Sequence, residues 1–221
     1  MNNILEIDGV ILEYNGRKIL QDVYLKSETG KITGLLGRNG SGKTSLMNII
    51  YGNIFISNSS IRIDKKTLPR TYRQPEKIRY LPQFSYTPKG LTIKKIFKDY
   101  KLDFSDFTNI FPDLEKHYNS KISTLSGGEI RIIEIYSILA SKTLFCMLDE
   151  PFSQVMPLHI ESIKTLINRE KINKGIILSD HLYEHILEIC DDLYVINNGK
   201  VHLTSDHKDI ETLGYAKINS Y

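Results

Sequence analysis

A glycine-rich segment, GRNGSGKT at residues 37–44, lies between the apolar run KITGLL and a segment with helical spacing. Glycines let backbone N–H groups turn inward around an anion, and the positive end of the following helix adds its dipole. This context indicates a phosphate-binding loop rather than a glycine-rich turn that binds nothing. In that interpretation Lys43 reaches the β- and γ-phosphates and the Thr44 hydroxyl binds Mg²⁺. The candidate nucleotide-binding residues of the loop are Gly37, Arg38, Asn39, Gly40, Ser41, Gly42, Lys43, Thr44 and Ser45.

Two adjacent carboxylates, Asp149 and Glu150, follow the apolar run TLFCML and open the stretch DEPFSQVMP. Carboxylates at the end of a buried strand can bind a metal ion and polarise an attacking water. The alternative is an exposed acidic pair at a strand end. Met156 follows seven positions after Asp149, and the sequence raises the question of what it does there.

The stretch LSGGE at residues 125–129 narrows the class of protein, because a phosphate loop alone is compatible with GTPases, kinases and motor ATPases. LSGGE directly precedes the helical pattern EIRIIEIYSILA, and it resembles the signature of ATP-binding cassette (ABC) ATPases. A helix N-terminus there offers N–H groups and a hydroxyl to an anion. The resemblance implies that two copies stack head to tail, with one copy closing over ATP held by the other. The residues implied in this contact are Ser126, Gly127, Gly128 and Glu129, the last at a position where the family more often has Gln.

The resemblance spans nearly the whole chain and assigns further roles. It implies that Asp149 holds Mg²⁺ and that Glu150 is the general base. Gln83, after YLP, matches the glutamine that senses the metal and the lytic water. His181, after GIILSD, matches the histidine that contacts the γ-phosphate. Tyr14 matches the aromatic residue that stacks on adenine, a contact worth roughly 1–3 kcal/mol per base.

The chain departs from the family pattern at Met156, where the family has an Asp before Pro that bonds across the dimer. A thioether is at best a weak acceptor and has no charge. Our hypothesis is that hydrolysis survives while communication between the two sites is weaker. The alternative is that Met156 simply packs against its neighbours.

The order of apolar patterns predicts an α/β fold with a parallel sheet flanked by helices. The resemblance implies an ABC-type P-loop NTPase core, with a mixed sheet flanked by helices, an N-terminal antiparallel β subdomain and an inserted α-helical subdomain. Asn15 and Gly16 separate two early strand patterns and favour an antiparallel pairing. We expect a single domain over residues 1–221. Its core with the β subdomain comprises 1–87 and 141–221, and the helical subdomain that carries the signature comprises 88–140.

Composition excludes little but is consistent with a globular chain that needs a partner to act at a membrane. The 221 residues carry a formal net charge of +3 and only two cysteines. Neither a disulfide framework nor a metal cluster is indicated. No apolar run approaches the roughly 20 residues of a membrane span, and the N-terminus does not resemble a secretion signal. We expect a cytoplasmic protein, peripheral on the inner membrane through its partner.

The leading functional prediction is the ATP-hydrolysing subunit of an ABC transporter, most similar to bacterial lipid, lipopolysaccharide-export or amino-acid branches. The expected partners are ATP with Mg²⁺, a second cassette in a homodimer or pseudo-symmetric dimer, and a separate transmembrane permease that docks near FSYTPKGLTIKKIF. No direct contact with nucleic acid is expected. Two alternatives stay open: a soluble ABC ATPase in cofactor assembly, and a regulatory subunit of low turnover.

Overall fold

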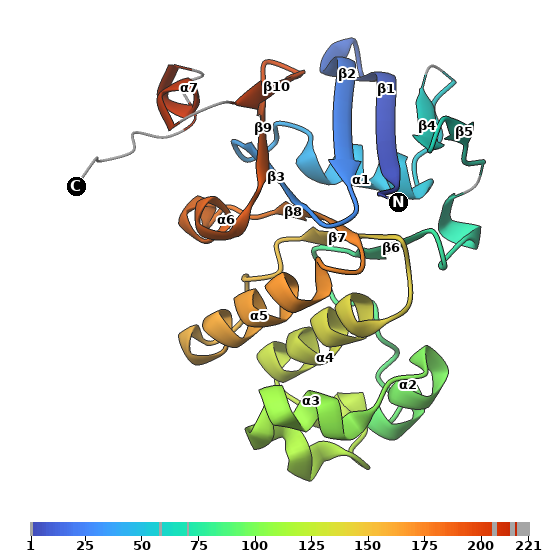
Figure 1. The fold of residues 1–221 in the computed structure, drawn as a ribbon, viewed down its shortest axis with the longest axis vertical. Helices are drawn as coiled ribbons and strands as arrows, with labels where there is room; N and C mark the ends of the chain where they lie inside the picture. Colours follow the sequence, from blue (N-terminus) through green and yellow to red (C-terminus); the bar gives the residue numbers. More distant parts are fainter. Residues whose placement is uncertain (1, 58, 70, 205–206, 213–214, 216–221) are drawn as a thin grey trace.

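Two sheets organise the computed structural model, which describes residues 2–57, 59–69, 71–204, 207–212 and 215. A four-stranded antiparallel sheet has the order β2-β1-β4-β5, and a six-stranded sheet has the order β10-β9-β3-β8-β7-β6 (Figure 1). The strands are β1 (Ile4–Tyr14), β2 (Arg17–Glu28), β3 (Ile32–Gly37), β4 (Ser60–Ile63), β5 (Lys66–Thr67), β6 (Ile78–Leu81), β7 (Phe145–Asp149), β8 (Gly175–Ser179), β9 (Asp192–Asn197) and β10 (Lys200–Thr204).

The four-stranded sheet begins with the predicted hairpin. Tyr14 pairs with Arg17 across a turn in which Asn15 and Gly16 both have positive φ, 48° and 76°. Turns with two positive φ values match the twist of paired strands, and Asn-Gly is the preferred sequence for them. The antiparallel pairing is therefore confirmed, and Tyr14 lies at the end of β1.

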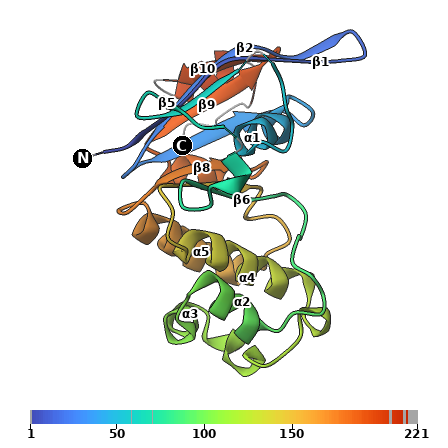
Figure 2. The same ribbon diagram turned by 90° about the vertical axis from the view of Figure 1, so that its right-hand side faces the viewer.

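The six-stranded sheet is parallel from β6 to β9, and only β10 runs antiparallel to its neighbour. Strands β3, β7 and β8 are buried along their whole length, because both faces of the sheet are covered. The four-stranded sheet and α1 (Lys43–Tyr51) cover one face, and α4 (Gly127–Ala140), α5 (Pro157–Glu170) and α6 (Tyr183–Ile189) lie on the other (Figures 1 and 2). The mixed α/β architecture matches the predicted fold class.

A cluster of short helices, including α2 (Ile93–Tyr100) and α3 (Phe104–Ile110), lies at the end of the molecule farthest from the four-stranded sheet (Figure 2). The 3₁₀ turns Pro112–His117 and Ile122–Thr124 complete it before α4 begins. Four of its phenylalanines pack on one another; they are Phe97, Phe104, Phe107 and Phe111. Phe97 and Phe107 also contact Tyr136 of α4, so the cluster and the sheet share one continuous core. The boundaries of a helical subdomain at residues 88 and 140 stay a prediction.

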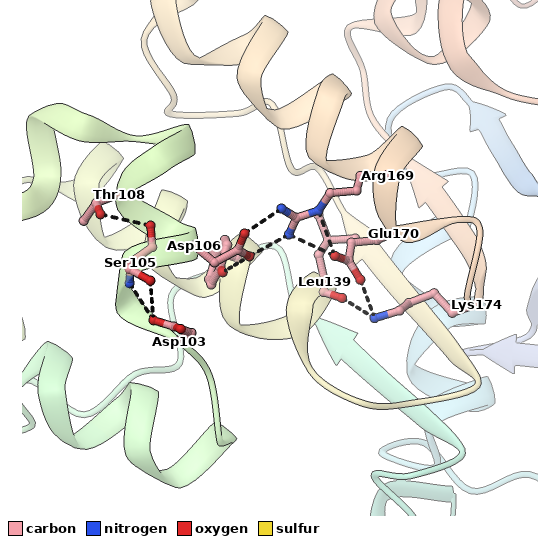
Figure 3. Close-up of polar contacts among 9 residues, drawn as sticks. Asp103, Ser105, Asp106, Thr108, Leu139, Arg169, Glu170 and Lys174 are labelled. Atoms are coloured by element: carbon pink, nitrogen blue, oxygen red, sulfur yellow. Dashed lines mark hydrogen bonds and ion pairs between the residues drawn. The ribbon is translucent and has the colours of Figure 1, made fainter.

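A chain of ionic contacts joins α3 to the end of α5 (Figure 3). Arg169 donates two hydrogen bonds of 3.0 Å to the carboxylate of Asp106 and also bonds Glu170. Glu170 pairs with the buried Lys174, which donates to the carbonyl oxygen of Leu139 at the end of α4. These contacts tie the helical cluster to the sheet on the side away from the phosphate loop.

Candidate functional site

The glycine-rich loop joins β3 to α1 as predicted. Gly42 is left-handed, with φ 106°, and an added Cβ there would lie 2.9 Å from the side chain of Leu20. Lys43 is only 6% exposed, and its Nζ donates to the carbonyl oxygen of Gly37 at 2.6 Å. Burial lowers the pKa of Lys43, although Asp149 and other nearby carboxylates oppose this effect. The loop therefore holds a buried cation beside its backbone.

A cavity of about 530 Å³ brings together residues that are far apart in the sequence. The loop lines one side of it, Tyr14 comes from the end of β1, and Gln83 from the segment after β6. Glu150 and His181 come from the ends of β7 and β8. Open α/β sheets bind ligands at the carboxyl ends of their parallel strands, and this cavity lies there.

Asp149 is fully buried at the end of β7 and is held by two hydroxyl groups. Ser179 Oγ donates to its Oδ1 at 2.6 Å, and the Tyr80 hydroxyl donates to its Oδ2 at 3.2 Å. Burial and the neighbouring Asp149 raise the pKa of Tyr80, so this phenol stays protonated as a donor. The carboxylate of Asp149 is therefore held in place by two groups that sequence reasoning did not identify.

Glu150 has a left-handed backbone, with φ 51°, which is uncommon for a residue with a side chain. Its N–H donates to the Ser179 carbonyl at 2.7 Å, and its Oε2 accepts from Ser153 Oγ at 3.3 Å. His181 Nδ1 lies 3.7 Å from the same Oε2. Strained backbone persists where the surroundings hold it and clusters at functional sites. The structure thus places Glu150 and His181 side by side.

Asp180 links the turns that carry these two residues. It is fully buried and accepts from the N–H groups of Phe152 and Leu182, both at 2.9 Å. Burial raises its pKa, and the two N–H donors oppose the shift. Sequence reasoning passed over Asp180, although its position directly before His181 was a signal.

The signature residues form the N-terminus of α4. Ser126 and Glu129 make a reciprocal capping box: Glu129 N–H donates to Ser126 Oγ at 3.3 Å, and Ser126 N–H donates to Glu129 Oε2 at 2.7 Å. None of residues 126–129 lines the described cavity of the same chain. The cavity therefore gathers Tyr14, loop residues 39–45, Gln83, Glu150 and His181. Gly37, Arg38 and Asp149 do not line it, and the signature turn lies outside it.

Met156 is 57% exposed, which argues against the interpretation that it simply packs against its neighbours. It is the N-cap of α5, followed by Pro157 as the first helical residue, and its side chain makes no capping hydrogen bond. Two charged residues of α4, Arg131 and Glu134, were also missed; they contact the segments of Gln83 and Glu150. Their signal was a charged pair at helical spacing inside the apolar pattern EIRIIEIYSILA.

Comparison with known proteins gives a family match over the same elements. The family model described as "ABC transporter" matches residues 20–153. The lipopolysaccharide export system ATP-binding protein LptB of Haemophilus influenzae is 30% identical over 94% of this chain and 92% of its own length. LptB of Escherichia coli K12 is 32% identical over 90% of this chain and 88% of its own length. A solved structure of the ATP-binding subunit of an ABC transporter superposes with a TM-score of 0.80 at 24% identity, covering 96% of this chain and 94% of that one.

The chain therefore belongs to the ABC transporter family, as an ATP-binding cassette. It is an ATPase subunit of the kind that binds ATP and acts with a membrane permease component. In the part of the chain that the structure describes, no helix has the length and apolar character of a membrane span. The same part holds no cluster of three or more His, Cys, Asp or Glu side chains suited to a metal ion.

Proposed function

We propose that this chain binds Mg-ATP between two cassettes packed head to tail and hydrolyses it, driving a separate transmembrane permease from the cytoplasmic face of the membrane. The observation that supports this most is the cavity in which Tyr14, the phosphate loop, Gln83, Glu150 and His181 meet. These residues come from five separate segments of the chain, and each has a role in binding or cleaving a triphosphate.

Binding uses the two ends of the cavity. Tyr14 is half exposed at the end of β1, where its ring is free to stack on adenine. The phosphates would accept from backbone N–H groups of the loop and of the N-terminus of α1, which begins at Lys43. Lys43, already buried in the loop, places its ammonium group at the β- and γ-phosphates. The partly desolvated lysine regains a favourable environment when it pairs with anionic oxygens.

Hydrolysis uses the carboxyl ends of β7 and β8. Glu150 accepts a proton from the attacking water as the water's oxygen forms a bond to the γ-phosphorus and the bond to the β-γ bridging oxygen breaks. His181, 3.7 Å from Glu150 Oε2, donates to a γ-phosphate oxygen and orients the glutamate. Water exclusion requires a second surface over the cavity, because Tyr14 and His181 are both about half exposed in one chain.

The donor set fits Mg²⁺, which prefers oxygen ligands and retains several waters. Thr44 would hold it through its hydroxyl, Asp149 through its carboxylate, directly or through water, and Gln83 through its amide oxygen. When bound, Mg²⁺ neutralises charge on the β- and γ-phosphates. The orientation of Asp149 by Ser179 and Tyr80 supports this assignment, because outer hydrogen bonds fix a ligand before the metal arrives.

We infer a second cassette and a permease from surfaces that one chain leaves exposed. Ser126, Gly127, Gly128 and Glu129 lie outside the cavity of their own chain, so a second copy or a homologous cassette would bring them to the γ-phosphate. Phe84 is 73% exposed and Tyr86 is 40% exposed, directly after Gln83. This apolar surface suits a helix from a permease, and it sits next to the residue that meets the nucleotide.

Replacing Glu150 with Gln tests the proposal. Loss of the general base should lower ATP turnover by about 10²–10⁴-fold, while equilibrium binding of ATP is retained. Steady-state phosphate release and nucleotide binding measure the two quantities. Glu161→Gln, a change of an exposed carboxylate on α5, is the matched control and should behave as the wild type. Unchanged turnover in Glu150→Gln would contradict the assignment.

A further inference from the structure

Arg131 is a buried cation that reaches two segments of the active site. It is 4% exposed on the second turn of α4. Its Nη1 donates to the carbonyl oxygen of Pro82 at 2.7 Å, directly before Gln83. Its Nη2 donates to the carbonyl oxygens of Asp149 at 2.7 Å and Glu150 at 3.1 Å. One guanidinium therefore bonds the backbone directly before Gln83 and the backbone of Asp149 and Glu150.

Glu134, one turn further along α4, holds the segment that follows Gln83. It is 1% exposed, and its Oε1 accepts from Ser85 Oγ at 2.7 Å and from the N–H groups of Tyr86 and Thr87, both at 3.1 Å. Its Oε2 lies 3.8 Å from Arg131 Nη1. Arg131 thus bonds the residue before Gln83, and Glu134 bonds residues 85–87 after it.

Stabilisation of the fold does not by itself explain why a buried ion pair is present at this position. Replacing such a pair by apolar residues of similar volume is often neutral or stabilising, because desolvation offsets the attraction. Ile135 and Ile138 are buried beside the pair on the same helix face, and Ser137 is the other buried polar residue there. What the pair provides and apolar residues do not is a set of directional bonds to chosen carbonyl and N–H groups.

The helix that carries the pair begins at the signature turn, Ser126 to Glu129. Close packing continues there, since an added Cβ on Gly128 would lie 2.9 Å from the backbone oxygen of Gln154. A displacement of the N-terminus of α4 would therefore be carried along the helix to Arg131 and Glu134. It would move the peptide of Glu150 and the Gln83 segment together.

We propose that Arg131 and Glu134 are positioning residues that join the signature turn to the backbone of Glu150 and to the Gln83 segment, so that contact at the turn sets the geometry of hydrolysis. The inference rests on the proposed function, in which Glu150 is the base and residues 126–129 meet a second cassette. It adds two residues that touch neither nucleotide nor metal.

Three variants test it in the full-length chain: Arg131→Met, Arg131→Lys and Glu134→Gln. We expect Arg131→Met to lower kcat by about 10- to 100-fold, because small misplacements of reacting groups have effects of this size. Equilibrium ATP binding and KM should stay within about threefold of wild type, because the loop contacts are intact. Arg131→Lys should recover part of kcat, since one ammonium restores the charge but cannot span both carbonyl sets. Glu134→Gln should lower kcat less than Arg131→Met.

Lys174→Met is the matched control. Lys174 is also buried and donates to the carbonyl oxygen of Leu139 at the opposite end of α4 (Figure 3). It also donates to the carbonyl oxygen of Ser141, and neither contact involves a residue that lines the cavity. Its loss should lower the midpoint of thermal unfolding while kcat stays within about twofold of wild type. A purely structural role for Arg131 predicts instead that the two variants behave alike.

The outcomes separate this inference from the proposed function. Wild-type kcat in a folded Arg131→Met, or an equal fall of kcat in Lys174→Met, would overturn the inference. If Arg131→Met does not fold, wild-type kcat in both Arg131→Lys and Glu134→Gln would overturn it as well. Failure of the proposed function shows differently, as absent turnover in the wild type or retained turnover in Glu150→Gln.

Discussion

Met156 is the N-cap residue directly before α5, and its side chain makes no capping hydrogen bond with the helix. The N-terminal N–H groups of a helix lack intrahelical partners, and Asp, Asn, Ser or Thr at the N-cap satisfy one of them. The backbone of Met156 is extended, as an N-cap requires, and Pro157 follows as the first helical residue. The site is therefore shaped for a capping carboxylate that the chain does not carry.

Met156→Asp should raise the free energy of unfolding by roughly 0.5–2 kcal/mol through this cap. Met156→Asn is the matched control, because it caps without a charge and should stabilise by a similar amount. Urea denaturation measures the effect, and no gain in either variant would contradict the capping argument.

The same variant tests the hypothesis about communication between two sites. ATP turnover and its dependence on ATP concentration should change in Met156→Asp but not in Met156→Asn, because only the former supplies a charge for a cross-dimer bond. Unchanged turnover and cooperativity in both variants would remove any role for the methionine in hydrolysis.

At the scale of elements, α4 connects most parts of the site. Its N-terminus carries the signature turn, its second and third turns hold the peptide of Glu150 and the Gln83 segment, and its remaining length packs on the sheet. The start of this helix depends on the capping box of Ser126 and Glu129. Hydrogen bonds from Ser126 lower the pKa of Glu129, and His117 adds a smaller effect.

Glu129→Ala should destabilise the chain by roughly 1 kcal/mol at pH 7, since it removes half of the capping box. Because the folded-state pKa of Glu129 lies below its usual value of 4.5, its contribution is fully present above that value. The contribution is lost as pH falls through the lowered folded-state pKa. The difference in unfolding free energy between wild type and variant should therefore shrink as the solution is acidified below pH 4.5.

Urea titrations at several pH values measure this difference. Glu129→Gln is the control, because a glutamine keeps the reciprocal hydrogen bond and does not titrate in this range. A difference that stays constant from neutral to strongly acidic pH would show that the carboxylate charge contributes nothing to the cap.

At the scale of the whole molecule, the helical cluster and the sheet share one core. The buried aromatic residues of α2 and α3 pack on α4, and α4 packs on β6 and β7. The ionic chain from Asp106 to Lys174 adds a second connection (Figure 3). The Arg169–Asp106 pair is partly exposed and contributes little, and in the buried Lys174–Glu170 pair desolvation offsets the attraction. The shared apolar core therefore provides most of the connection.

We therefore expect one cooperative unfolding transition rather than separate transitions for the helical cluster and the sheet. Far-UV circular dichroism and tyrosine fluorescence should give the same urea midpoint, because thirteen tyrosines and no tryptophan report on the chain. Two midpoints, or early loss of hydrogen-exchange protection throughout α2 and α3 alone, would contradict this expectation.

The sequence by itself determined the local parts of this protein. The loop from Gly37 to Thr44, the carboxylates at the end of β7 and the hairpin turn at Asn15 and Gly16 could be predicted, because their conformation and chemistry depend on neighbours a few residues away. Strand and helix patterns also predicted the sheet, since burial on both faces requires continuous apolar runs.

Only the tertiary structure decided which distant groups meet. That Tyr80 and Ser179 hold Asp149, that Asp180 ties two turns, and that Arg131 and Glu134 hold the backbone beside Gln83 and Glu150 could not be predicted from spacing. These contacts join residues between 18 and 69 positions apart, and packing rather than local propensity brings them together. The exposure of Met156 was open for the same reason, because burial is a property of the assembled fold.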